Sequence, residues 1–157
     1  MKPRLTWESQ RVTRVELPAA PPANWTPEQF RALDAEMAEL PLGYPPGVSA
    51  FRRRVWDALR QVPFGQTVTY RELARRIGNP KAVRAVGGAC AANPLLLAVP
   101  CHRVVAQHGL GGFALGLGWK RKLLELEAAA AATAASATKS ASKGRSKAGR
   151  SRSGNRS

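Results

Sequence analysis

The chain has few residues of the kinds that build disulfide frameworks, metal sites or membrane spans. Among its 157 residues are two cysteines, Cys90 and Cys101, and two histidines. Two cysteines make no disulfide framework, and a working thiol predicts a reduced, cytoplasmic compartment. No apolar run approaches the ~18 residues of a membrane-spanning helix. The charged N-terminus lacks the apolar segment that a secretory signal requires.

Acidic residues are also scarce. The chain has 25 Lys and Arg against 10 Asp and Glu, which gives a net charge of +15. Such a balance predicts a polyanionic partner, with nucleic acid favoured over a membrane surface. At 44% hydrophobic residues, the chain still has enough apolar side chains for a core. The sequence is therefore expected to fold as one compact, basic domain with appendages.

The C-terminal 30 residues have no acid at all. Residues 128–157 carry seven Lys and Arg, first within an alanine run and then among Ser and Gly. The alanines can extend the preceding helix, but beyond about residue 136 the composition cannot bury enough apolar surface to fold. We predict a disordered basic tail. Two interpretations stay open, a nonspecific DNA tether whose phosphate contacts weaken with salt and a solubilising extension.

The remaining sequence divides near residue 47. Residues 1–47 are Pro-rich and predict a small, reduced N-terminal subdomain and linker, with strand-like stretches between Leu5 and Leu17. Thr26 followed by Pro27 predicts the start of a helix. Nothing in this part suggests chemistry. Residues 48–127 open with a helical apolar stripe from Phe51 to Val62 and predict a mainly helical domain. The fold class is therefore α/β in the wider, α+β sense.

Two short helices in this second part indicate a helix-turn-helix within a winged-helix-like domain. Thr69 and Glu72 predict a capping box in which each side chain satisfies the other's backbone donor. The first helix runs to about Ile77. Asn79 is expected to cap the second, which runs from Pro80 to about residue 91.

The second of these helices is made almost entirely of small residues around Arg84. A helix that reads base edges carries Asn, Gln, Ser or several Arg. Small residues instead favour close, sequence-independent contact, as in minor-groove binding. The alternative is a buried helix that packs tightly through those residues, and for Arg84 we favour a functional role.

Pro100-Cys101-His102-Arg103 is the candidate reactive motif. Residues 95–99 predict a short buried strand that leads into it. Positive charge beside a cysteine lowers the thiol pKa, and the thiolate is the reactive form. Val104 and Val105 predict a further strand. Five glycines between residues 109 and 118 show no phosphate-loop pattern, and Trp119 begins a final helix with Glu127 near its end.

Residues 51–127 resemble the O6-alkylguanine-DNA alkyltransferases, also called methylated-DNA–protein-cysteine methyltransferases. Four stretches occur in the family's order and approximate spacing: FRRRVWDALRQVPFGQTVTYRELA, RAVGGACAANP, VPCHRVV and GGFALGLGWKRKLLELE. The resemblance implies direct repair of double-stranded DNA, in which an alkyl group leaves the O6 atom of guanine, or O4 of thymine, for the cysteine. Each molecule acts once, as a monomer, without cofactor. The N-terminal part lacks the cysteines and histidines of zinc-binding relatives, so no metal is expected.

The resemblance also implies roles for single residues. Cys101 is the acceptor, His102 the base acting through a bridging water, Glu127 its orienting acid, and Asn93 the link between the active-site turn and the helix-turn-helix. Because the target base lies inside the duplex, it must be flipped out. The resemblance implies that Tyr70 pushes on the 3′ phosphate of the target and that Arg84 fills its vacated place in the base stack. The backbone carbonyls of Cys101 and Val104 accept from the guanine amino group. Phe113 and Ala114 belong to a glycine-rich loop that closes over the base. Phe113 and Ala114 replace the Tyr and Ser of some relatives, which changes the range of alkyl groups accepted.

Three other functions fit the sequence less well. An alkyltransferase-like protein that binds lesions without reacting lacks the cysteine, so Cys101 argues against it. A purely DNA-binding module of the nucleoid type leaves Cys101, His102 and Glu127 without a purpose. A cysteine hydrolase needs an oxyanion site and an acyl substrate, and the sequence points to neither.

Overall fold

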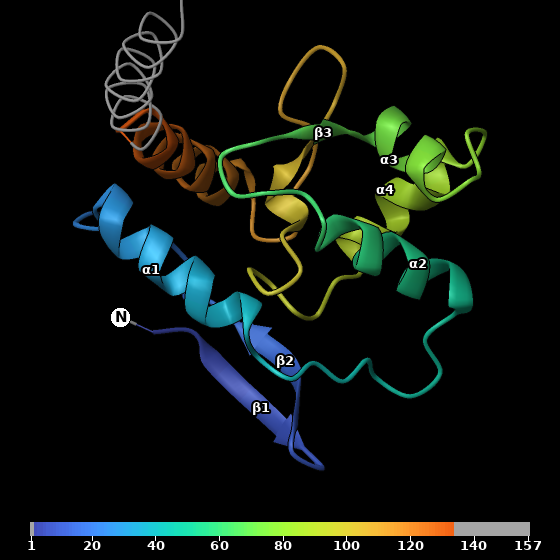
Figure 1. Ribbon diagram of the computed structural model, residues 1–157, viewed down its shortest axis with the longest axis horizontal. Coiled ribbons are helices and arrows are strands. Elements are labelled where there is room, and N and C mark those ends of the chain that lie inside the picture. Colours follow the sequence, from blue (N-terminus) through green and yellow to red (C-terminus); the bar gives the residue numbers. More distant parts are fainter. Residues whose placement is uncertain (1, 134–157) are drawn as a thin grey trace, which may run out of the picture.

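The computed structural model describes residues 2–133 as a mixed α and β fold (Figure 1). The tail beyond residue 133 lies outside the described residues. In chain order the elements are β1 (Arg4–Glu8), β2 (Arg11–Glu16), α1 (Pro27–Ala38), α2 (Ala50–Leu59), β3 (Val68–Thr69), α3 (Tyr70–Arg76), α4 (Val83–Ala91), a 3₁₀ turn (Cys101–Arg103), β4 (Val104–Val105) and a helix over residues 117–133.

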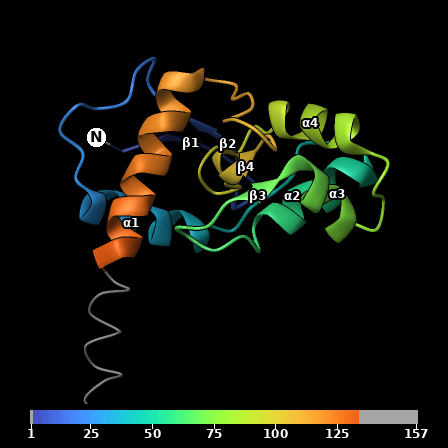
Figure 2. The same cartoon turned by 90° about the horizontal axis from the view of Figure 1, so that it is seen from above.

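The helices form two groups around the short strands. In Figure 2 the helix of residues 117–133 lies beside α1, and α2, α3 and α4 gather on the opposite side, with β3 and β4 between them. Within residues 2–133, no helix has the length and apolar character needed to cross a membrane.

The N-terminal hairpin is docked on the rest of the chain by backbone hydrogen bonds. β1 and β2 pair antiparallel, and Val12 and Val15 of β2 are buried. The Val12 N–H donates to the Pro41 carbonyl at 2.7 Å, and the Val15 N–H donates to the Pro94 carbonyl at 2.8 Å. Pro94 stands shortly before Cys101 in sequence, so the hairpin supports the segment that leads into the reactive motif.

Helix α1 begins where Thr26 and Pro27 predicted. The Thr26 side chain accepts from the Gln29 N–H, and the Gln29 side chain accepts from the Thr26 N–H, which makes a complete capping box. Phe30 on this helix is fully buried, and its ring lies 5.8 Å from that of Phe64 and 6.1 Å from that of His102.

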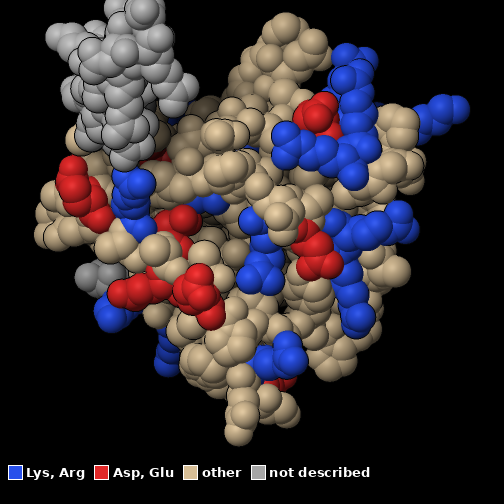
Figure 3. All heavy atoms as spheres, viewed as in Figure 1, with Lys and Arg blue, Asp and Glu red and all other residues tan. Residues whose placement is uncertain are grey.

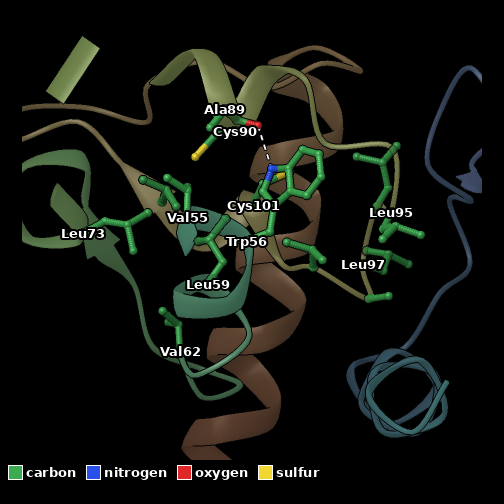
Figure 4. Close-up of a cluster of buried hydrophobic side chains, with 14 of the residues drawn as sticks. Val55, Trp56, Leu59, Val62, Leu73, Ala89, Cys90, Leu95, Leu97 and Cys101 are labelled. Carbon is green, nitrogen blue, oxygen red and sulfur yellow. Dashed lines mark hydrogen bonds between the residues drawn. The ribbon is translucent and has the colours of Figure 1, made fainter. Parts of the chain in front are cut away.

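Helix α2 supplies the centre of the core. Its residues Val55, Trp56 and Leu59 are buried, as the apolar stripe predicted. The Trp56 indole N–H donates to the Ala89 carbonyl at 2.9 Å and so ties α2 to α4 (Figure 4). Cys90 and Cys101 lie in this same buried cluster.

The predicted capping box of α3 is only half formed. Thr69 accepts from the Glu72 N–H at 3.1 Å, but the Glu72 carboxylate pairs with Arg75 and Arg76 instead of returning to Thr69. The helix itself ends at Arg76, close to the predicted end.

Helix α4 starts later than predicted. Asn79 does not cap it, and the helix begins at Val83 rather than Pro80. The Asn79 carbonyl instead accepts from the Ala82 N–H at 3.0 Å. Asn at the first position and Pro at the second favour such a β-turn, so these residues form the turn between the helices.

The segment before the reactive motif is a buried turn and not the predicted strand. It forms isolated bridges from Leu95 to Val15 and from Leu96 to Val99, and Leu97 adopts a positive φ of 69°. Val104 and Val105 do form the predicted strand, and β4 pairs in parallel with β3. This pairing places Tyr70, the residue after β3, beside the chain that leaves Cys101.

The helix of residues 117–133 begins two residues before the predicted Trp119 and continues into the alanine run, as the sequence allowed. Leu123 and Leu126 face the core, while Leu124 is only half-buried. Glu127, predicted near the end, lies inside the helix and is 1% exposed. Its burial makes partners for its carboxylate necessary.

Candidate active site

Cys101 begins a single 3₁₀ turn and is 4% exposed. Its N–H donates to the Val99 carbonyl at 2.8 Å. Asn93, which follows the end of α4, braces the same segment from within. Its Nδ2 donates to the Val99 carbonyl, and its Oδ1 accepts from the Leu95 N–H, both at 2.8 Å. The Asn93 side chain therefore holds the segment in front of Cys101 in place.

The electrostatic setting of Cys101 differs from the one predicted. Burial raises the pKa of the Cys101 thiol to about 11, against the opposing influence of Asn93 and the Lys120 ammonium. The expectation that His102 and Arg103 lower this pKa was wrong, because both side chains bind Glu127 instead. At neutral pH the resting cysteine is a protonated thiol and needs a base to react.

Glu127 is the centre of a buried polar network. Its carboxylate contacts His102 Nε2 and accepts from Arg103 Nε at 2.9 and 3.2 Å. It also accepts from the Gly65 N–H at 2.8 Å. Burial alone would raise the pKa of Glu127, but the His102 hydrogen bond and the charges of His102 and Arg103 lower it below its usual value. The structure thus brings together the predicted pair of His102 and Glu127.

The second ring nitrogen of His102 has no hydrogen-bond partner among residues 2–133. His102 is fully buried, and within the described residues Nδ1 makes no hydrogen bond. A buried polar atom without a partner is costly and uncommon. Because Nε2 is already held by Glu127, Nδ1 is the atom through which this imidazole can exchange a proton with the site.

Asp34 extends the network into the N-terminal part, where the sequence suggested no chemistry. Its carboxylate accepts from Arg103 Nη2 at 2.7 Å. Burial raises the pKa of Asp34 despite the opposing charge of Arg103. The missed signal is helical spacing, since Asp34 stands four residues after the buried Phe30 and three before the buried Met37.

A cavity of about 170 Å³ opens beside Cys101. Three predicted residues, Tyr70, Phe113 and Ala114, line it. Cys90 also lines it, and burial raises the pKa of that thiol to about 12. Cys90 is therefore a neutral wall of the cavity, a role that the sequence did not reveal.

Lys120 is a third residue whose place at the site the sequence did not reveal. It is fully buried, and its Nζ donates to the carbonyls of Val104 at 2.5 Å and Gly112 at 2.8 Å. The ammonium lies 5.9 Å from the centre of the Tyr70 ring. Burial lowers the pKa of Lys120, while the two cysteines oppose that shift. Val104, predicted to bind the guanine amino group, already has one acceptor position occupied by Lys120.

Arg84 does not line the cavity. It is exposed on the first turn of α4. Basic residues also gather on the neighbouring helices, over the side of α2 and α3 in Figure 3, whereas acidic residues are more frequent over α1. The exposed arginines on α2 and α3 are Arg52, Arg53, Arg54, Arg71, Arg75 and Arg76. This side of the molecule is complementary to a phosphate backbone.

No metal site is formed by the residues that the structure describes, since no three His, Cys, Asp or Glu side chains group together there. The chemically active groups at the site are a buried thiol, an imidazole–carboxylate pair and a buried ammonium.

Comparison with known proteins gives the family. Residues 50–129, just over half of the chain, match the family described as "6-O-methylguanine DNA methyltransferase, DNA binding domain". The chain belongs to this family. The match includes every residue singled out at the site except Asp34 of α1. Two curated relatives and one solved structure extend the comparison beyond this domain.

A probable methylated-DNA–protein-cysteine methyltransferase of Acanthamoeba polyphaga mimivirus is 46% identical over 100 residues, which cover 64% of this chain and 61% of that protein. The corresponding methyltransferase of Methanosarcina acetivorans is 45% identical over 107 residues, 65% of this chain and 69% of that protein. The chain thus spans less than two thirds of the mimivirus protein. The crystal structure of Mycobacterium tuberculosis OGT in complex with DNA matches with a TM-score of 0.64 and 34% identity, over 80% of this chain and 86% of that one.

Proposed function

We propose that this protein repairs double-stranded DNA by moving the alkyl group of O6-alkylguanine, and of O4-alkylthymine, onto Cys101. The observation that carries the proposal is a buried cysteine that lines a small cavity and is followed in sequence by His102, whose imidazole is paired with the Glu127 carboxylate. The names of the relatives point to the same reaction. The protein acts as a monomer in the cytoplasm, held on DNA by its basic side.

The transfer is a displacement at carbon. The Cys101 sulfur forms a bond to the alkyl carbon, the bond from that carbon to O6 breaks, and the thiol proton ends on the guanine. Since the resting thiol has a pKa of about 11, the proton must be removed as the sulfur attacks. His102 Nδ1 takes it through a water, and Glu127 stabilises the imidazolium through Nε2. The thioether is stable, so each molecule reacts once.

The target base must leave the helix to reach a buried thiol. Tyr70 is half-buried and lines the cavity. In this proposal its side chain acts on the DNA backbone at the flipped nucleotide. Arg84 projects from the first turn of α4 and fills the vacated stack. The smooth surface made by the small residues of α4 allows the helix to approach the groove closely.

The test is the intact mass of the full chain after incubation with duplex DNA that contains O6-methylguanine. We expect one added methyl group per protein, located at Cys101 by peptide mapping and saturating at one equivalent. Cys101→Ala should abolish transfer while DNA binding remains, and Cys90→Ala serves as the matched control.

Other outcomes would redirect the assignment. Tight binding of the lesion without any mass change would support the lesion-recognition alternative. Methylation at Cys90, or transfer by the Cys101→Ala protein, would contradict the proposed acceptor.

A further inference from the structure

The cavity beside Cys101 adjoins a much larger one. The larger cavity has a volume of about 710 Å³ and lies between the N-terminal hairpin and the end of α4. Ala91 and Ala114 line both spaces. Because each of these two residues has only a methyl side chain, little side-chain volume separates the two cavities at this point. At about 170 Å³ the inner cavity is below the roughly 300–1,000 Å³ of typical ligand sites, whereas the outer one lies within that range.

The walls of the outer cavity are held by the contacts already described. The Val15 N–H binds the Pro94 carbonyl and fixes β2 against one wall. Asn93, itself a lining residue, fixes the adjacent chain through its bonds to Leu95 and Val99. On the opposite side the Gly116 N–H donates to the Phe113 carbonyl at 2.9 Å and closes the turn that carries Ala114. The cavity is therefore part of the folded structure.

The rim of the outer cavity is basic. Lys2, Arg4 and Arg14 line it against a single acid, Glu16. Glu16 lies 3.5 Å from Arg14, and both side chains are solvent-exposed. Glu36, outside the cavity lining, lies 4.0 Å from Lys2. One positive charge therefore remains in excess at the rim. Such a charge attracts an anion at modest strength, and salt weakens the attraction.

We infer that the outer cavity receives bulky substituents on O6, past Ala91 and Ala114, and that its basic rim favours substituents that end in a carboxylate over those that end in an ammonium. This inference rests on the proposed transfer to Cys101. In that reaction the same bond breaks, from O6 to the first carbon of the substituent, and the whole substituent stays on the sulfur. The N-terminal hairpin then acts as a specificity element of the catalytic site.

The experiment uses free bases, so that attraction of DNA to the basic surface plays no part. The probes are O6-benzylguanine and its derivatives with a carboxylate or an aminomethyl group at the para position. The rate of thioether formation at Cys101 of the full chain is followed by intact mass and peptide mapping. We expect the carboxylate probe to react about two- to fivefold faster than the aminomethyl probe at low salt, a span typical of exposed charge pairs. The difference should largely vanish in 1 M NaCl, where screening extends over only about 3 Å.

Variants separate the two parts of the inference. Arg14→Glu should reverse the order of the charged probes, whereas Arg11→Glu, on the same strand and outside the cavity lining, should leave it unchanged. Ala91→Leu should slow all benzyl probes more than the reaction with O6-methylguanine in duplex DNA.

Each failure has a separate meaning. Equal rates for the carboxylate and aminomethyl probes at low salt would overturn the role of the rim. Equal slowing of benzyl and methyl transfer by Ala91→Leu would overturn the passage between the cavities. If the methylated duplex also failed to modify Cys101, the proposed function itself would fall.

Discussion

Among single residues, Lys120 carries the least expected function. The sequence drew attention to His102 and Arg103 beside Cys101, yet both side chains are bound to Glu127. The charge that counteracts the raised pKa of Cys101 comes from Lys120, 19 positions along the chain. The same ammonium joins the chain at Val104 to the loop at Gly112. Lys120 therefore acts on both the charge of the thiol and the shape of the cavity.

Replacing Lys120 tests this double role. Lys120→Met removes a charge that lowers the pKa of Cys101. It should slow transfer from free O6-benzylguanine by about tenfold, because a rise of about one unit in the thiol pKa lowers the thiolate fraction about tenfold. The pH at which iodoacetamide modifies Cys101, identified by peptide mapping, should rise in the variant. Lys122→Met, a half-buried position on the same helix, is the matched control. An unchanged pH profile for Cys101 in a folded Lys120→Met protein would contradict an electrostatic role.

At the scale of elements, the loop of residues 109–116 depends on one close approach. Gly111 has a φ of +73°, and a Cβ there would lie 2.8 Å from Tyr70 Cε2 and 3.3 Å from the Ala106 nitrogen. Gly116 has a similar φ of +93° but has open space around it. Alanine at either position should cost about 1 kcal/mol of folding free energy, because alanine is strained at positive φ.

Only Gly111→Ala must also displace Tyr70. We expect its repair rate in duplex DNA to fall about tenfold below that of Gly116→Ala, because a misplacement of ~1 Å at a reacting site can cost up to about 10²-fold in rate. The free energy of unfolding, from chemical denaturation, should be lowered to a similar extent in both. Equal repair rates in the two variants would show that the contact between the loop and Tyr70 is unimportant.

Elements with strong local signals were predictable from the sequence. Thr26 and Pro27 specified the start of α1, and the stripe from Phe51 specified the buried face of α2. The conformation of residues 95–99 was not predictable, because the periodicity of a short apolar run does not by itself identify its secondary structure. Its shape depends on Asn93, whose bonds to Leu95 and Val99 are tertiary contacts. The shift of the α4 start had a local cause, the turn chemistry of Asn79 and Pro80.

Long-range contacts explain what the sequence missed at the site. Cys101, His102 and Glu127 were recognisable through the family's motifs. The family resemblance did not extend to α1, so the ion pair between Asp34 and Arg103, 69 positions apart, had no signal that pointed to its partner. A boundary near residue 47 stays a prediction.

At the scale of the whole molecule, the N-terminal part and the catalytic part share buried contacts. Phe30 of α1 packs near Phe64 and His102, and Asp34 binds Arg103. We therefore expect the described chain to unfold in one transition. Removing one partner of a mostly buried pair leaves the other charge short of a hydrogen bond.

Asp34→Asn should lower the free energy of unfolding by about 2 kcal/mol, the scale of one hydrogen bond to a charged group. Glu36→Gln, on the same helix, removes an exposed pair with Lys2 at 4.0 Å and should change stability by less than about 0.5 kcal/mol. Chemical denaturation, followed by fluorescence and by circular dichroism, measures both. Because Arg103 also holds Glu127, Asp34→Asn should in addition slow transfer to Cys101. A second transition in the wild-type protein, or an effect of Asp34→Asn no larger than that of Glu36→Gln, would show that α1 covers the active site without supporting it.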